Sequence, residues 1–304
     1  EMINFVPGIV PGIGMAMNCF TQKGDKVMIQ PPVYHPFAWV TTRNERTLVT
    51  NPLKWENGMY RMDLDAFREL IKGCKLFILC NPHNPGGVVW TEAELRAIAD
   101  ICYDEKVLVF SDEIHADLTL PPHTHRPFAT VSEKARMNSV TFMSPSKAFN
   151  MPGLSASHAL IFNEDLRKRF RIYMDAGELD MGHVFAFLSV EAAYSHGTEW
   201  LDQCLAYIQG NIDFVDDFLK NHAPKIKAIR PEASYLVWLD CRELKLSQKD
   251  LNEFFVDKAH LALNDGEMFG KEGIGFMRLN VASPRCIIEK AMKQLADAYQ
   301  LYIK

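Results

Sequence analysis

Long hydrophobic runs are missing from this 304-residue sequence. No apolar stretch reaches the roughly 18 residues of a membrane-spanning helix, so an integral membrane protein is not expected. A surplus of basic residues is missing too, because 33 lysines and arginines face 38 aspartates and glutamates. Without an excess of basic residues, the sequence is not expected to be a nucleic-acid-binding protein. Internal repeats and low-complexity tracts are also missing, which argues against a solenoid or a long disordered region.

Closely spaced cysteine pairs are lacking as well. The seven cysteines are scattered without a CxxC pair, so a disulfide framework and a zinc site are both poor interpretations. Several lie inside apolar runs, where reduced and buried thiols are typical. His123 and His125 stand in a proline-rich stretch, but no further ligands follow at suitable spacing. We therefore expect no metal site and a cytoplasmic location.

What the sequence does contain is an alternation of short apolar runs and helical patterns. Short strands that are apolar throughout are typical of a parallel sheet buried on both faces. The expected strands are Lys26–Gln30, Leu76–Cys80, Val107–Ser111, Ser139–Met143 and His158–Phe162. This pattern predicts an α/β domain.

Helices are predicted before and between these strands. Thr91, with Glu94 three residues later, forms a capping-box pattern for a helix that ends near Tyr103. Helical spacing also predicts a helix over Asp63–Ile71 and another over Gly14–Phe20.

After Glu164 the pattern becomes mainly helical. One long element is predicted between Trp200 and Leu219, because apolar residues recur along it at helical spacing. The segments expected beyond it are a strand over Ser234–Leu239, a helix near Ser247–Ala259, a strand through Arg278 and a final helix over Ile288–Tyr299. We therefore predict a large α/β domain (1–195) whose central sheet is mostly parallel and covered by helices. A linking helix (196–222) and a small α+β domain (223–304) follow.

Polar residues that could bind a ligand or take part in catalysis lie at or near the ends of the predicted strands. Lys147, Asp112 and Asn84 follow three different apolar runs, and Arg278 lies inside a fourth. Open α/β sheets bind ligands at the carboxyl ends of their strands. A lysine nucleophile, a carboxylate for a pyridinium nitrogen, an amide and a carboxylate-binding arginine are the parts of a pyridoxal phosphate (PLP) site. Each residue alone also fits ordinary loop or turn chemistry, so the prediction depends on the combination.

A glycine turn precedes the first predicted helix. Such a turn at a helix N-terminus presents free N–H groups and a positive dipole end, which suit a phosphate. Taken alone, the stretch from Phe5 to Ile13 is better interpreted as a plain entry into a helix. Tyr34 is likewise an ordinary half-buried aromatic residue when it is considered by itself.

Four motifs in this order resemble fold type I PLP-dependent enzymes of the aminotransferase class I/II superfamily. The motifs are Pro31-Pro-Val-Tyr-His-Pro-Phe37, Cys80-Asn-Pro-His-Asn-Pro-Gly-Gly87, Ser111-Asp-Glu-Ile-His-Ala-Asp117 and Ser144-Pro-Ser-Lys-Ala-Phe-Asn150. Their particular form is similar to the cystathionine β-lyase-like C–S lyases of the maltose-regulon-modulator type. The resemblance implies cleavage of β-substituted cysteines, such as cystathionine, to pyruvate, ammonia and a thiol. A PLP-dependent aminotransferase, a regulatory protein that binds a partner and an inactive truncated fold stay open as alternatives.

The resemblance also implies roles for individual residues. Lys147 would carry PLP as a Schiff base and transfer protons, and Asp112 would pair with the pyridinium N–H. Asn84 and His115 would bond the phenolic oxygen, and Arg278 would bind the substrate α-carboxylate. The remaining expected contacts are Tyr34 stacked on the ring, Gly8, Ile9, Val10, Ser144 and Ser146 at the phosphate, and Tyr34 with Asn84 at the substrate.

Three features depart from the family pattern. His115 stands where many relatives have a tyrosine, and Ser155 stands where many aminotransferases have a phosphate-binding arginine. A neutral imidazole at position 115 can donate the same hydrogen bond, but Ser155 lacks the arginine's charge, so we expect weaker retention of the cofactor than in aminotransferases with that arginine. Relatives also carry a segment before the point at which this chain opens, Glu1, and we expect that segment to be missing here. Because family sites are built at subunit interfaces, the resemblance implies a homodimer that binds a small amino-acid substrate.

Overall fold

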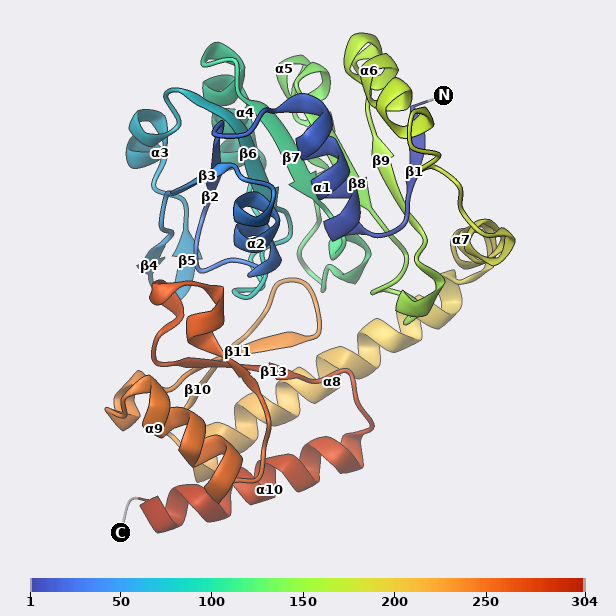
Figure 1. Cartoon of the computed structure of the whole chain (residues 1–304). Coiled ribbons are helices and arrows are strands. Elements are labelled where there is room, and N and C mark those ends of the chain that lie inside the picture. Colours follow the sequence, from blue (N-terminus) through green and yellow to red (C-terminus); the bar gives the residue numbers. More distant parts are fainter. Residues whose placement is uncertain (1, 303–304) are drawn as a thin grey trace.

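The chain forms two sheets connected by one long helix (Figure 1). The computed structural model describes residues 2–302. A seven-stranded sheet lies in the N-terminal part and a four-stranded sheet in the C-terminal part. Helix α8 (Thr198–His222) runs from the side of the large sheet to the small sheet. A separate hairpin pairs β4 (Lys54–Glu56) with β5 (Met59–Arg61).

The large sheet is mostly parallel, which confirms the predicted fold class. Its strand order is β1-β9-β8-β7-β6-β2-β3. The strands from β8 to β3 are parallel, whereas β9 pairs antiparallel with both β8 and β1. The strand bounds are Ile3–Val6 (β1), Lys26–Ile29 (β2), Thr47–Thr50 (β3), Cys74–Cys80 (β6), Leu108–Asp112 (β7), Ser139–Met143 (β8) and Ser157–Leu160 (β9).

Helices cover both faces of the large sheet (Figure 1). Leu76 and Ile78 of β6 pack with the residues of α1, and Phe77 and Leu79 pack with those of α4. This alternation explains why the strand is apolar at successive positions. Each buried side chain of this size contributes about 1.5–3 kcal/mol. The helix bounds in this part are Ile9–Phe20 (α1), Pro36–Arg43 (α2), Leu64–Leu70 (α3), Glu92–Asp104 (α4), Glu133–Met137 (α5), Glu164–Asp175 (α6) and Val184–His196 (α7).

Local capping signals place most helix starts, but one predicted start is wrong. The capping box of Thr91 and Glu94 is present at α4, as predicted. The first helix begins at Ile9 instead of Gly14, with Gly8 as its N-cap. Pro11 does not delay the helix, because N–H groups in the first helical turn have no intrahelical partner and a proline loses nothing there.

The C-terminal sheet packs against α8 and α10 (Arg285–Tyr302). Its order is β10-β11-β13-β12, and every pairing is antiparallel. The strand bounds are Lys227–Ile229 (β10), Leu236–Asp240 (β11), Asn264–Asp265 (β12) and Phe276–Asn280 (β13). The helix expected near 247–259 is confirmed in position, but α9 (Gln248–Glu253) continues as a π-helical turn at residues 254–258.

Side chains of the C-terminal part complete the core of the N-terminal part. Trp238 and Phe276 are stacked 5.2 Å apart and are buried among residues of β6 and α4. The indole Nε1 of Trp238 also donates to the Tyr60 hydroxyl, at 3.2 Å. This shared core fixes β13, which carries Arg278, relative to the large sheet. We propose to keep the domain boundaries near residues 195 and 222, on either side of α8.

Candidate active site

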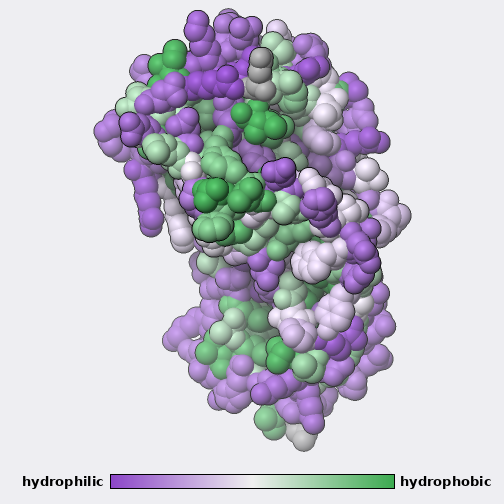
Figure 2. All heavy atoms as spheres, turned by 90° about the vertical axis from the view of Figure 1, so that its right-hand side faces the viewer, coloured by the Kyte–Doolittle hydropathy of each residue, from purple (hydrophilic) through white to green (hydrophobic). Residues whose placement is uncertain are grey.

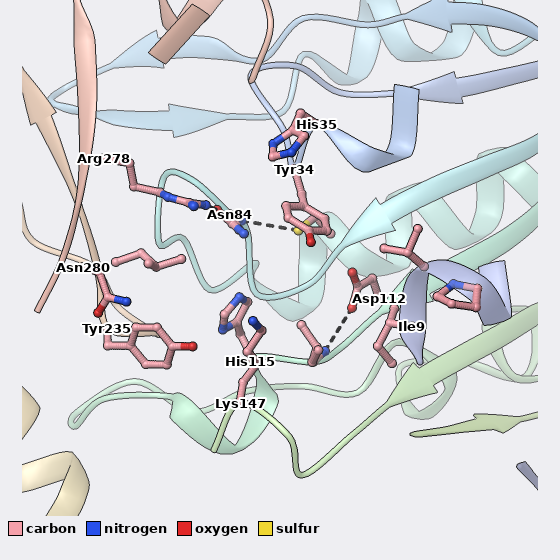
Figure 3. A pocket seen from close by; sticks show the side chains of 15 residues that line it. Ile9, Tyr34, His35, Asn84, Asp112, His115, Lys147, Tyr235, Arg278 and Asn280 are labelled. Atoms are coloured by element: carbon pink, nitrogen blue, oxygen red, sulfur yellow. Dashed lines mark hydrogen bonds between the residues drawn. The ribbon is translucent and has the colours of Figure 1, made fainter. Parts of the chain in front are cut away.

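Three neighbouring parallel strands deliver polar side chains to one cavity. Cys80 at the end of β6 pairs in register with Asp112 at the end of β7, and Lys147 follows β8. Together with Arg278 from β13, these side chains surround a cavity of 430 Å³ (Figure 3). The lining residues are Ile9, Val10, Pro11, Tyr34, His35, Cys80, Asn84, Asp112, Ile114, His115, Lys147, Tyr235, Leu236, Arg278 and Asn280.

Most of the residues predicted for the site lie in this lining. The exceptions are Gly8, Ser144 and Ser146. Gly8 is adjacent to the lining as the N-cap of α1. The expectation that Ser144 bonds a phosphate needs correction, because its hydroxyl donates to the Ala156 carbonyl at 2.7 Å and accepts from the Ser146 N–H. Ser146 lies in the lining of a second, adjoining cavity.

Asp112 is a buried carboxylate with little to stabilise its charge. Its Oδ1 accepts a hydrogen bond of 3.1 Å from the Ile114 N–H, and its side chain lines the cavity. Burial, with the neighbouring charge of Glu113, raises the pKa of Asp112 to about 7 against the opposing effect of the Ile114 hydrogen bond and the Lys147 charge. A cationic N–H donor in the cavity would favour the ionised form.

His115 is a neutral imidazole in the same cavity. Burial, and then the nearby charges of Lys147 and Arg278, lower the pKa of His115 to about 3. Its Nδ1 is buried and has no hydrogen-bond partner among residues 2–302. The ring lies edge-on to Tyr235, with 6.2 Å between the centroids. His115 therefore lines the cavity and has one ring nitrogen without a partner among these residues.

Arg278 is held in place by neutral amides. Its Nη1 donates to Oδ1 of Asn84 at 2.8 Å, and its Nη2 donates to Oδ1 of Asn264 at 2.7 Å. The guanidinium lies over the Phe269 ring, 4.7 Å from its centroid. Burial lowers the pKa of Arg278 to about 10, so it remains charged at neutral pH. No carboxylate within residues 2–302 pairs with it, which leaves its charge available for an acidic group of a ligand.

A hydrogen bond to the sulfur of Cys80 stabilises the turn that carries Asn84. The Asn84 N–H donates to the Cys80 Sγ at 3.3 Å (Figure 3). Burial raises the pKa of the Cys80 thiol far above the neutral range, so the sulfur stays protonated. Asn84 thereby keeps its amide at the cavity lining, where its Oδ1 accepts from Arg278.

The N-terminus of α1 reaches the cavity without a side-chain cap. Ile9 and Val10 line the cavity, and N–H groups in the first turn of a helix have no intrahelical partner. Gly8 has a φ of 154°, a conformation that favours glycine, and a Cβ there would lie 3.3 Å from Pro11 Cδ. Open N–H groups at a positive dipole end suit an anionic group such as a phosphate.

His125 and two other candidate metal ligands, Glu113 and His83, have partners within the protein. The buried Glu113 accepts from His125 Nε2 at 2.8 Å and from the hydroxyl of Ser111 at the same distance. Burial lowers the pKa of His83 to about 4, and its Nε2 lies 2.9 Å from the Pro32 carbonyl oxygen. Within residues 2–302, no group of three or more His, Cys, Asp and Glu residues is arranged to hold a metal ion.

Sequence reasoning missed four polar or reactive residues of the lining. They are His35, Cys80, Tyr235 and Asn280. Asn280 had a signal, because it stands two positions after Arg278 and so faces the same side of β13. Tyr235 had none: it reaches the cavity because residues 233–234 are hydrogen-bonded to the loops at Gly87 and Leu118.

The groups around the cavity fit PLP. A lysine amine, a buried carboxylate with a raised pKa, an unpartnered imidazole nitrogen and an uncapped helix N-terminus are all present. They match the aldehyde, the ring nitrogen, the phenolic oxygen and the phosphate of this cofactor. Ser155, at the position of the missing arginine, is exposed and has a left-handed backbone with a φ of 47°.

Comparisons with known proteins agree with this chemistry. The family model described as aminotransferase class I and II matches residues 1–295. The chain is 39% identical to cystathionine beta-lyase PatB of Bacillus subtilis, over 98% of this chain and 78% of that protein. Cystalysin from Treponema denticola, whose structure contains pyridoxal 5'-phosphate, has a TM-score of 0.96 and 36% identity, over 100% of this chain and 77% of that chain. The PLP-bound C–S lyase from Staphylococcus hominis has a TM-score of 0.90 and 33% identity, over 98% and 78%.

Proposed function

Because the chain belongs to the aminotransferase class I and II family, we propose that it is a PLP-dependent C–S β-lyase. Its substrates are β-substituted cysteines such as cystathionine, which it cleaves with one water to pyruvate, ammonia and a thiol. The observation that supports this most is 39% identity to a cystathionine β-lyase along almost the whole chain. The cavity that joins Lys147, Asp112 and Arg278 supports PLP chemistry independently.

Each part of the cofactor has a partner in the cavity. Lys147 would hold the aldehyde carbon, Asp112 the ring nitrogen, and Asn84 with His115 the phenolic oxygen. Tyr34 would lie against the ring, and the N-terminus of α1 at Gly8, Ile9 and Val10 would hold the phosphate. Each role follows from the chemistry of the group and from its place at the cavity.

The reaction then depends on three side chains. The bound cofactor supplies an electron-withdrawing pyridinium ring that stabilises negative charge at Cα of an attached amino acid. Arg278 binds the α-carboxylate through two parallel N–H donors and so orients the substrate. Lys147, in its uncharged form, takes the proton from Cα. Asp112, as a carboxylate, keeps a proton on the ring nitrogen. The Cβ–S bond breaks with its electron pair going to sulfur, which leaves as a thiolate.

One assay separates this function from amino transfer, for which the family model is named and for which the same side chains would serve. The PLP-loaded protein is mixed with L-cystathionine, and pyruvate and ammonia are followed without any added keto acid. Pyruvate and ammonia in equal amounts support the lyase. Turnover that requires a 2-oxo acid and releases no ammonia would make the protein an aminotransferase.

Replacing Arg278 by lysine should raise KM about 10- to 100-fold for substrates with an α-carboxylate. The lysine keeps the charge but loses the two-pronged geometry, and a hydrogen bond to a charged group is worth about 1.5–3 kcal/mol. Steady-state kinetics with L-cystathionine measure the change. Arg242→Lys is the matched control, because Arg242 pairs with Asp240 outside the cavity. An unchanged KM in Arg278→Lys would place the carboxylate site elsewhere.

We also propose that the protein forms a homodimer in the cytoplasm. Helix α7 exposes apolar side chains, including Val184, Phe185 and Leu188, which are 61%, 67% and 55% exposed. Apolar residues gather on the face that Figure 2 displays, the side of the molecule on which α7 lies in Figure 1. A contiguous apolar patch of this kind is rare on monomers. The seven free cysteines agree with a reducing compartment, and no helix in residues 2–302 is long and apolar enough to cross a membrane.

The double variant Val184→Glu, Leu188→Glu should halve the mass measured by sedimentation, because two buried and unpaired charges would oppose association. Ile172→Glu is the control, since Ile172 is 62% exposed on α6 and is outside the α7 patch. A wild-type protein with the mass of one chain would contradict the proposal.

A further inference from the structure

A second cavity adjoins the first one on the other side of Lys147. It has a volume of 420 Å³ and shares Lys147, Tyr235 and Asn280 with the first cavity. Tyr235 and Lys147 lie side by side at this boundary, and the Tyr235 hydroxyl points into the first cavity (Figure 3). A substrate bound beside Lys147 in the first cavity can therefore extend its substituent into the second cavity.

The two cavities differ in chemistry. The first holds Asp112, His115 and Arg278. In the second, Lys147 is the one charged residue among the lining residues that the structure describes. Its lining includes the buried Leu118 and Ile208. The cavity thus offers apolar surface and no carboxylate or guanidinium.

Aromatic side chains form the outer wall of the second cavity. Trp200 lies in this wall and stacks on Phe149 with 6.0 Å between the ring centroids. Tyr207 lies there too, and its hydroxyl already accepts from the Arg285 N–H at 2.7 Å. Both rings are therefore held in place, and they present surface that suits an aromatic or aliphatic group.

We propose that the second cavity is the subsite for the group that leaves with the substrate sulfur, and that this group is uncharged and apolar. The inference rests on the proposed lyase function and narrows its substrate class to cysteines with an aryl, aralkyl or alkyl substituent on sulfur. The leaving part of cystathionine ends in an ammonium and a carboxylate. Burying these charges against Leu118 and Ile208, without counter-charges, costs binding energy.

The first test compares three substrates on the PLP-loaded protein. Pyruvate release is measured with S-benzyl-L-cysteine, L-cystathionine and S-methyl-L-cysteine, whose methyl group is too short to fill the second cavity. We expect kcat/KM for the benzyl substrate to exceed that for cystathionine by about tenfold or more. Equal values, or a preference for cystathionine, would overturn the inference while leaving the lyase function intact. No pyruvate from any of the three would instead overturn the proposed function.

The second test fills or opens the cavity. Cys204 lies in its lining on α8, and Cys204→Phe should lower the ratio of kcat/KM for the benzyl substrate to that for the methyl substrate by about tenfold. Cys286→Phe is the matched control, because Cys286 is exposed on α10, and it should keep the ratio within about twofold. Trp200→Ala, which removes the outer wall, should also lower this ratio. It is the alternative test if Cys204→Phe does not fold. An unchanged ratio in the folded variants would contradict the subsite.

A third measurement tests binding to the second cavity without any reaction. Benzyl methyl sulfide carries the substituent and the sulfur but no amino acid group, so it probes the second cavity alone. Calorimetry should show that it binds the wild-type protein and that Trp200→Ala weakens this binding about tenfold. Equal binding by the two proteins would overturn the inference even if the protein proved to have no lyase activity.

Discussion

Replacing Lys147 by alanine should reduce pyruvate formation from L-cystathionine on the order of 10⁴-fold. Lys147 lines the cavity, and we propose that it is both the covalent attachment for the cofactor and the base that takes the Cα proton. An alanine side chain can do neither. Single-turnover kinetics would measure the loss, with PLP supplied in excess so that weaker retention does not limit the rate.

A covalent readout separates attachment from catalysis. Borohydride should fix PLP to the Lys147 peptide of the wild-type protein, and mass spectrometry should find no such peptide in Lys147→Ala. Lys168→Ala is the control, since Lys168 is exposed on α6 and does not line the cavity. Full turnover by Lys147→Ala, or PLP fixed to another lysine, would contradict the assignment of Lys147 as the PLP-binding lysine and the base.

Replacing Asp112 by asparagine should lower turnover about 10²- to 10³-fold. The asparagine amide could still bond to the ring nitrogen, but it could not supply the negative charge that holds a proton there, and a preorganised charge in a buried site is worth about that factor. Asp117→Asn is the matched control. Asp117 is another carboxyl whose pKa is raised mainly by burial, and it accepts from the Tyr194 hydroxyl outside the cavity. A full-rate Asp112→Asn enzyme would mean that another group protonates the ring.

The same substitution should change how stability depends on pH before PLP is added. The pKa of Asp112 is raised in the folded chain, from 3.8 to about 7. A raised pKa stabilises the fold below the unfolded value and loses this contribution as pH rises through the folded value. The wild-type protein should therefore lose up to about 4 kcal/mol between pH 4 and 7 from this group. Denaturant titrations should show that Asp112→Asn lacks this decline, and parallel curves for the two proteins would contradict the raised pKa.

Much of the fold followed from local patterns. The apolar runs predicted a sheet buried on both faces, because each strand must offer apolar side chains to helices on two sides. Thr91 and Glu94 predicted the start of α4, since a capping box acts over three residues of the same segment. The start of α1 was missed because Pro11 was treated as part of a turn, although a first helical turn accepts it.

Most of the site was also predicted, but through the resemblance of motifs to a family. Lys147, Asp112 and Asn84 follow strands, so the sequence places them at one edge of the sheet once the strands are parallel. Ser144 shows the limit of this reasoning. It is near Lys147 in sequence, yet its hydroxyl is engaged by the Ala156 carbonyl and does not line the cavity.

The sequence by itself determined the order of strands and helices, the motifs that identify the family and the residue types that can perform the chemistry. These follow from interactions between residues a few positions apart and from the periodicity of apolar side chains. Only the tertiary structure decided that Tyr235 stands between two cavities, that Asn84 and Asn264 hold Arg278, and that burial raises the pKa of Asp112. Each of these depends on groups far apart in the chain, whose distances and exclusion of water exist only once the two sheets pack on a shared core.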